Sequence, residues 1–196
     1  MEKYQNKSYN GLSFDALKQF LDAKVKQYNT NEFIESDPIQ IPHLFSKKED
    51  IEISAFLTAT IAWGNRKSII QNAKRLMQRM DNAPYDFICS HQSNDLNVFE
   101  GFVHRTFNAH DAVQFIKSLK HIYTTYGGME SVFSKYAEKT TLQNAIHHFK
   151  NHFFETWRAT TIYINYLSKP VRTYVYVITS ITVSYTHLTL TTILLV

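Results

Sequence analysis

The sequence predicts an all-α domain, a helical bundle-like fold, over residues 1–157, and a different kind of segment over residues 158–196. Through most of the first part, apolar residues recur at steps of three and four, as on the buried face of a helix. No segment there alternates between apolar and polar residues in the way of a half-buried strand. A chain of 196 residues with 44% apolar content is large enough for one domain with a real core.

The first predicted helix covers residues 14–28 and is amphipathic. Its apolar face consists of Phe14, Leu17, Leu21, Val25 and Tyr28. A connector follows, in which Pro38 and Pro42 prevent a continuous helix. The residues before the two prolines, Asp37 and Ile41, are therefore predicted to be extended.

A second helix is predicted to begin near residue 47, because Ser46 and Glu49 have the spacing of a capping box. Residues 53–63 are apolar on every side, which is typical of a helix surrounded by others. Phe56 and Ile61 should therefore be among the most buried residues of the chain.

The next predicted boundary is the stretch Trp63-Gly64-Asn65-Arg66. Gly64 is expected to end the central helix as residue C′, and Asn65 to cap a helix reaching Met80. The buried seam of that helix is predicted to be Ile69, Ala73, Leu76 and Met80.

Three more helices are predicted further along the chain. The strongest covers residues 109–126, capped by Asn108 and stopped by Gly127-Gly128. Residues 129–138 and 142–155 complete the domain.

The stretch after Gly64 is also the predicted binding site. Arg66 and Lys67 lie in the first turn of a helix, where the macrodipole disfavours cations, so their presence suggests a bound anion such as a phosphate. The predicted nucleic-acid-binding residues are Asn65, Arg66, Lys67, Arg75 and Arg79. An alternative is a helical protein-interaction module without catalytic activity, whose basic face is only solvated surface.

No familiar catalytic motif gives the chain an activity, and the catalytic residues stay unassigned. Phosphate-binding glycine loops, HExxH and paired cysteines are absent from the sequence. His148, His152 and Glu155 share one helix face and could hold a metal, but a solvated polar face produces the same pattern. We expect no metal and no small-molecule cofactor.

Charge and cysteine content indicate a cytoplasmic protein. The single Cys89 fits a reducing compartment, and no secretory signal pattern opens the chain. The formal net charge is +4, but three cations and no acids follow Trp157, so only +1 belongs to the first part. The overall charge is therefore weak evidence for nucleic-acid binding, and the possible DNA partner rests on the local site.

The last segment differs in composition from the rest. From Thr173 onward it is uncharged apart from His187 and rich in Thr, Ser and β-branched residues. A membrane anchor is one alternative, but the Thr and Ser content makes the segment weakly hydrophobic, and we expect no membrane contact. The stretch "VSYTHLTL" resembles a translated sequencing adapter. Residues 158–196 are therefore predicted to be non-native or disordered, and the native chain to be truncated at its C-terminus.

Two stretches carry a family resemblance. "DPIQIPHLFSKKEDIEISAFLTATIAWGNRKSI" and "FVHRTFNAHDAVQFIKSLKHIYTTYGG" resemble the bacterial family known as domain of unknown function 2400, over about residues 31–156. That family is similar in layout to helix-hairpin-helix DNA glycosylases, in which an early apolar helix ends in a polar turn facing a flipped base. The resemblance implies a fragment of a glycosylase-like, nucleic-acid-binding domain whose catalytic half lies beyond this chain.

Overall fold

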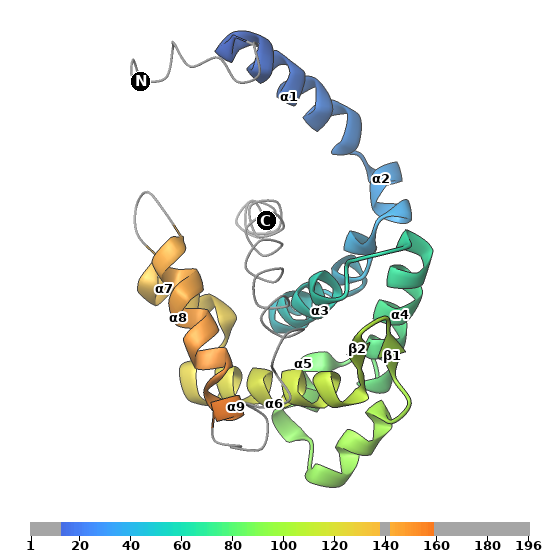
Figure 1. Cartoon of the computed structure of the whole chain (residues 1–196), viewed down its shortest axis with the longest axis vertical. Coiled ribbons are helices and arrows are strands. Elements are labelled where there is room, and N and C mark those ends of the chain that lie inside the picture. The colour runs from blue at the N-terminus through green and yellow to red at the C-terminus, as the bar shows by residue number, and fades with distance from the viewer. Residues whose placement is uncertain (1–12, 138–141, 159–196) are drawn as a thin grey trace.

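The structure, a computed structural model, describes residues 13–137 and 142–158 (Figure 1). It is helical apart from one short hairpin, which confirms the all-α prediction. The elements are α1 (Phe14–Tyr28), α2 (Asn31–Ser36), η2 (Pro38–Gln40), η3 (Pro42–Leu44), α3 (Lys48–Thr60), α4 (Arg66–Arg79), α5 (Pro84–Ser90), η4 (Ser93–Phe99), β1 (Val103–His104), β2 (Phe107–Asn108), α6 (Ala109–Tyr126), α7 (Met129–Tyr136), α8 (Gln143–Phe153) and α9 (Glu155–Arg158). The predictions for residues 159–196 lie outside the described residues.

The core forms around α3 and α6. Phe56 on α3 is 6% exposed and Ile61 is 0% exposed, so both predictions of burial are confirmed. The Phe56 ring lies 6.1 Å from that of Phe115 on α6 and 5.4 Å from that of Phe153 on α8. The central helix is thus covered by helices from the second half of the chain, as its all-round apolar character requires.

The predicted capping box at the start of α3 is wrong. The cap position is Lys47, whose side chain makes no capping hydrogen bond, so Ser46 lies one residue too early. With Lys47 as the cap, the third residue of the helix is Asp50. Its carboxylate accepts a hydrogen bond of 2.8 Å from the backbone N–H of Tyr85. A carboxylate of α3 therefore satisfies an unpaired amide in the first turn of α5.

The boundary between α3 and α4 is partly as predicted. Helix α3 ends at Thr60, with Ile61 as its cap, so Gly64 is not the residue that stops it. Gly64 instead gives the connector a backbone turn at φ +104°, a region that favours glycine. Asn65 does cap α4, because its Oδ1 accepts from the Ser68 N–H at 3.3 Å. The predicted seam of Ile69, Ala73, Leu76 and Met80 is buried.

The connector before α3 is only partly extended. Asp37 is extended and its carboxylate accepts from the N–H of Ile39 at 3.0 Å. Ile41 is helical instead, with φ −68° and ψ −53°, so that prediction is wrong. The reason is that each proline opens a short 3₁₀ turn, and Ile41 ends one turn and precedes the next.

Helix α6 has the predicted ends, and a hairpin precedes it. Asn108 and Asp111 form a reciprocal capping box, and Gly127 adopts the left-handed conformation at the other end. Strands β1 and β2 pair antiparallel, with Val103 opposite Asn108. Two residues per strand are too few for an alternating pattern, which is why the sequence did not predict them.

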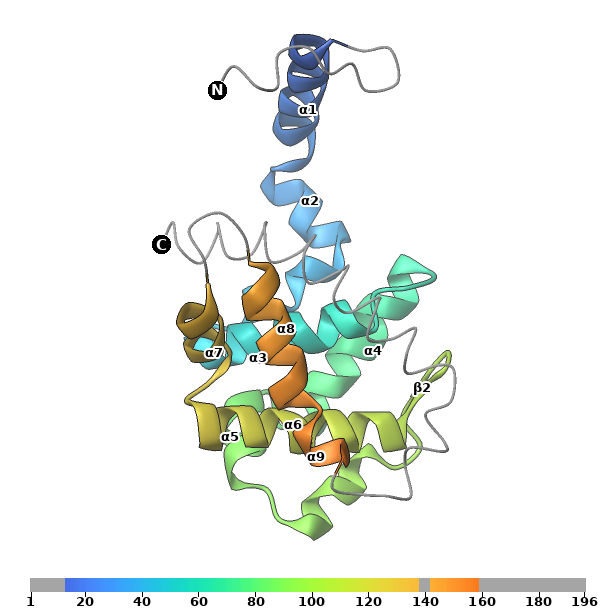
Figure 2. The same cartoon turned by 60° about the vertical axis from the view of Figure 1, so that its left-hand side comes forward.

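Helix α1 stands apart from the other described helices in both views (Figures 1 and 2). None of its residues is buried, and within the described residues the ring of Tyr28, at the end of its predicted apolar face, contacts that of Phe33 on α2. Among the described residues, no helix is long and apolar enough to span a bilayer.

Candidate functional site

The predicted binding residues lie along one helix, α4, and four of them are exposed. Asn65, Arg66 and Lys67 form its N-terminal end, and Arg75 lies more than two turns further on. In the described part of the chain, no ion pair to a carboxylate involves Arg66, Lys67 or Arg75. These cations are therefore available to an external anion.

Arg79, the fifth predicted residue, has contacts within the protein. Its guanidinium donates to the carbonyl of Val98 and, at 3.1 Å, to the carbonyl of Glu100. It also lies 5.8 Å from the centre of the Phe102 ring. Arg79 therefore fastens η4 and the following turn to the end of α4.

The β1–β2 hairpin carries another cation, Arg105, whose side chain reaches the turn before α4. Arg105 lies in the two-residue loop of the hairpin, and its Nη1 is 2.9 Å from the position that a Cβ would occupy at Gly64. The guanidinium thus passes over the glycine two residues before Arg66. Arg105 is exposed and has φ +55°, a conformation in which Gly, Asn or Asp is usual.

A chain of hydrogen bonds fixes the hairpin to the junction. Arg75 donates to Asn72 Oδ1 at 3.1 Å, and Asn72 Nδ2 lies 3.0 Å from His104 Nδ1. His104 Nε2 lies 3.3 Å from the carbonyl oxygen of Trp63, and the two rings are 5.6 Å apart. The loop that carries Arg105 is consequently held in one position relative to α4.

His104 is neutral in this arrangement. Its side chain is buried, and burial lowers its pKa, an effect to which the nearby charge of Arg105 adds. The tautomer that satisfies both contacts carries its proton on Nε2, which donates to the Trp63 carbonyl, while Nδ1 accepts from Asn72. His104 is therefore a positioning group and not part of the exposed charge.

We call the exposed set Asn65, Arg66, Lys67, Arg75 and Arg105 the junction surface. None of its four cations pairs with a carboxylate of the described residues. Arg66 and Lys67 lie at the N-terminal end of α4, whereas Arg75 lies on the opposite side of the helix from Arg66, where Asn72 and His104 connect it to the hairpin. Cations distributed around one end of a helix can contact an extended anion at several points.

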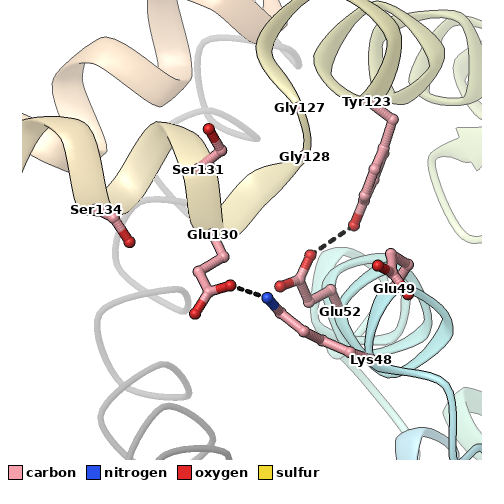
Figure 3. A pocket seen from close by; sticks show the side chains of 9 residues that line it. All are labelled: Lys48, Glu49, Glu52, Tyr123, Gly127, Gly128, Glu130, Ser131 and Ser134. Atoms are coloured by element: carbon pink, nitrogen blue, oxygen red, sulfur yellow. Dashed lines mark hydrogen bonds and ion pairs between the residues drawn. The ribbon is translucent and has the colours of Figure 1, made fainter.

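A polar pocket lies elsewhere, between α3, α6 and α7 (Figure 3). It is lined by Lys48, Glu49, Glu52, Tyr123, Gly127, Gly128, Glu130, Ser131 and Ser134. Tyr123 donates to Glu52 at 2.7 Å, and Lys48 pairs with Glu130. Burial raises the pKa of Glu52, and burial together with the Glu52 charge raises the pKa of Tyr123. The contacts of Glu52 and Glu130 connect α3 to α6 and to α7. The carboxylates that line the pocket would repel a phosphate.

A third polar group, the Glu155 cluster, consists of Glu155, His121, His152 and Tyr126. Both histidines and the tyrosine hydroxyl contact the Glu155 carboxylate, at 2.8, 2.9 and 2.7 Å respectively. Burial would raise the pKa of Glu155, but these three hydrogen bonds lower it to about 2.

The metal alternative of the sequence finds no support in this cluster. The His148 ring stacks on Tyr136 with centres 3.7 Å apart. No group of metal-ligating residues with suitable geometry occurs within residues 13–137 and 142–158.

Sequence reasoning identified the α4 side of the junction surface and missed the hairpin side. His104 and Arg105 lie in the stretch "FVHRTF", which was noticed for its family resemblance alone. A basic residue three positions before the helix cap Asn108 carries no signal of its own, and the contact with Gly64 depends on the fold.

The chain belongs to the family described as protein of unknown function (DUF2400), whose family model matches residues 37–175. The match includes both the junction and the hairpin, and it begins after α1. It also runs past residue 157, the predicted end of the helical domain. No curated protein and no solved structure matches the chain.

Proposed function

We propose that this protein binds nucleic acid through the junction surface, as part of a helical domain with the layout of a helix-hairpin-helix DNA glycosylase. One observation carries the proposal: Arg105 is held at a positive φ and passes over Gly64, two residues before Arg66 in the sequence, and neither arginine pairs with a carboxylate of the described residues. Gathering like charges costs free energy, as does a left-handed arginine. A bound polyanion would offset the repulsion between the cations and would explain why the strained arginine is kept.

The openness of the surface favours a long anion over a small one. Small ligands are usually enclosed in concave pockets, whereas all five residues of the junction surface are exposed. A nucleic-acid backbone carries regularly spaced phosphates, so several separate guanidinium and ammonium groups can contact it at once. The Oδ1 of Asn65 is engaged in capping, so its Nδ2 is the part of this side chain that can donate to a phosphate beside the four cations.

In this proposal the described residues bind and do not catalyse. The glycosylase-like layout would place a flipped base beside the turn at residues 63–67, but any group that attacks it is assigned to sequence beyond the described residues. For the described residues the proposal is therefore DNA binding, with no chemical step assigned to them.

The test is a fluorescence-anisotropy titration of labelled duplex DNA with the full chain over a range of salt concentrations. Phosphate contacts predict an affinity that falls steeply with salt, because each contact releases counterions. Arg66→Ala should weaken binding by about 1–3 kcal/mol and leave the melting temperature nearly unchanged.

Lys135→Ala is the matched control, since it removes the same charge from an exposed position on α7, away from the junction surface. It should leave the affinity almost unaltered. Equal losses in the two variants would show that only net charge matters. Unchanged binding in Arg66→Ala together with a lower melting temperature would make Arg66 structural and defeat the proposal.

A further inference from the structure

Helix α1 carries an apolar stripe that the described residues leave about half exposed, although Tyr28 at its end contacts the ring of Phe33 on α2. The exposed members of the stripe are Phe14 at 48%, Leu21 at 52%, Val25 at 59% and Tyr28 at 49%, and Phe20, at 55%, lies to one side of it. A helix of 15 residues is marginal in water without tertiary packing, so α1 needs a covering surface to be stable. We propose that this surface is the α1 helix of a second copy of the chain, packed antiparallel. The inference does not rest on nucleic-acid binding.

The charges of α1 favour a second copy in the antiparallel direction. Lys18 and Asp22 neutralise each other in an ion pair of 2.6 Å. What remains is Asp15 in the first turn, and Lys24 and Lys26 toward the other end. Antiparallel pairing sets the acidic end of each helix against the basic end of its partner, whereas parallel pairing sets like charges side by side.

The available area fits a weak dimer. An aromatic side chain buries roughly 150–250 Å² and Leu or Val less, so the four stripe side chains, each about half exposed, offer on the order of 300–400 Å² per helix. Two copies would then bury about 600–800 Å², which lies in the range of weak, transient contacts below about 1,200 Å². The dimer should therefore be reversible and populated only at high protein concentration.

The stripe is separate from the matched family region, which begins at residue 37. Association through α1 would leave the junction surface of each copy free, since that surface lies on α4 and the hairpin. A pair of chains would then present two copies of the basic surface.

The experiment measures molar mass by sedimentation equilibrium over a hundredfold range of concentration, for the full chain and two variants. Leu21→Glu places a charge in the stripe while keeping a good helix former. Leu44→Glu is the matched control, because Leu44 is 63% exposed and lies in η3, away from the stripe. We expect the full chain and Leu44→Glu to approach twice 22.9 kDa at high concentration and Leu21→Glu to stay at that single mass.

Circular dichroism provides a second readout, because helix content should rise with concentration in the full chain and not in Leu21→Glu. A monomer at every concentration would overturn the proposal, as would a dimer that Leu21→Glu leaves intact. A monomeric chain whose melting temperature falls in Leu21→Glu would also overturn it, since the stripe would then be covered by the chain's own residues.

Discussion

The junction surface and the Glu155 cluster use charge in opposite ways. In the Glu155 cluster, one carboxylate receives hydrogen bonds from His121, His152 and Tyr126, and these bonds join α6 to α8 and α9. On the junction surface, by contrast, four cations have no carboxylate partner among residues 13–137 and 142–158. The first arrangement stabilises the fold, and the second only adds repulsion to it.

The difference separates polar groups that hold the protein together from polar groups that serve a partner. A network such as that of Glu155, in which one carboxylate receives three hydrogen bonds, should be detected by stability measurements and should have no effect on binding. An unpaired surface should behave in the reverse way. Substitutions in the two regions can therefore be sorted by which of the two measurements they change.

The largest effect is expected in the core that both regions share. Phe56→Ala should lower the free energy of unfolding by about 3–5 kcal/mol, because a buried ring leaves a cavity. Denaturant unfolding measures this loss. The DNA affinity of the protein that remains folded should be unchanged, because the substitution affects stability and not the junction surface. A loss below about 1 kcal/mol would mean that α3 is not the centre of the fold.

The next effect concerns Glu155 and pH. Its folded-state pKa of about 2 lies below the ordinary 4.5, so the ionised carboxylate adds stability that is complete above pH 4.5 and is lost as the pH falls toward 2. Glu155→Gln should cost about 1–2 kcal/mol at neutral pH, since the carboxylate is 39% exposed and partly screened by solvent.

The measurement is thermal unfolding between pH 7 and pH 2, in which the variant should lose less stability on acidification than the parent. Glu130→Gln is the control, because it removes one partner of an exposed ion pair and should cost less than about 1 kcal/mol. Identical pH profiles for the parent and Glu155→Gln would show that the cluster contributes no such stability.

A smaller effect is expected for Arg79, which distinguishes it from Arg66. Arg79→Ala removes hydrogen bonds to the carbonyls of Val98 and Glu100 and should cost about 1 kcal/mol of stability. Its effect on DNA affinity should be smaller than that of Arg66→Ala. If the two variants weaken binding equally while stability is unaltered, Arg79 belongs with the junction surface after all.

The sequence predicted the elements whose signals are local. Asn65 and Asn108 are helix caps in the structure, as their side chains indicated, and the all-round apolar helix is central. The sequence did not predict the start of α3 correctly, where the cap position is Lys47 and not Ser46. The nearby carboxylate of Asp50 accepts a hydrogen bond from the N–H of Tyr85 at the start of α5, and this contact joins residues 35 positions apart.

The same limit explains the candidate site. Arg66 and Lys67 could be selected because they are unfavourable at a helix N-terminus, which is a local signal. Arg105 could not, because its significance depends on the absence of a side chain at Gly64 and on His104 reaching the carbonyl of Trp63, 41 residues away. Contacts over such separations are fixed by packing and not by periodicity.

Arg105→Gly tests the central claim most directly, because it should move binding and stability in different directions. Glycine accepts φ +55° without strain, so the free energy of unfolding should stay the same or rise by up to about 1 kcal/mol. The loss of one phosphate contact should weaken DNA binding by about 1–2 kcal/mol and flatten its salt dependence. Paired anisotropy and unfolding measurements on this one variant would contradict the account if binding were unchanged and stability fell.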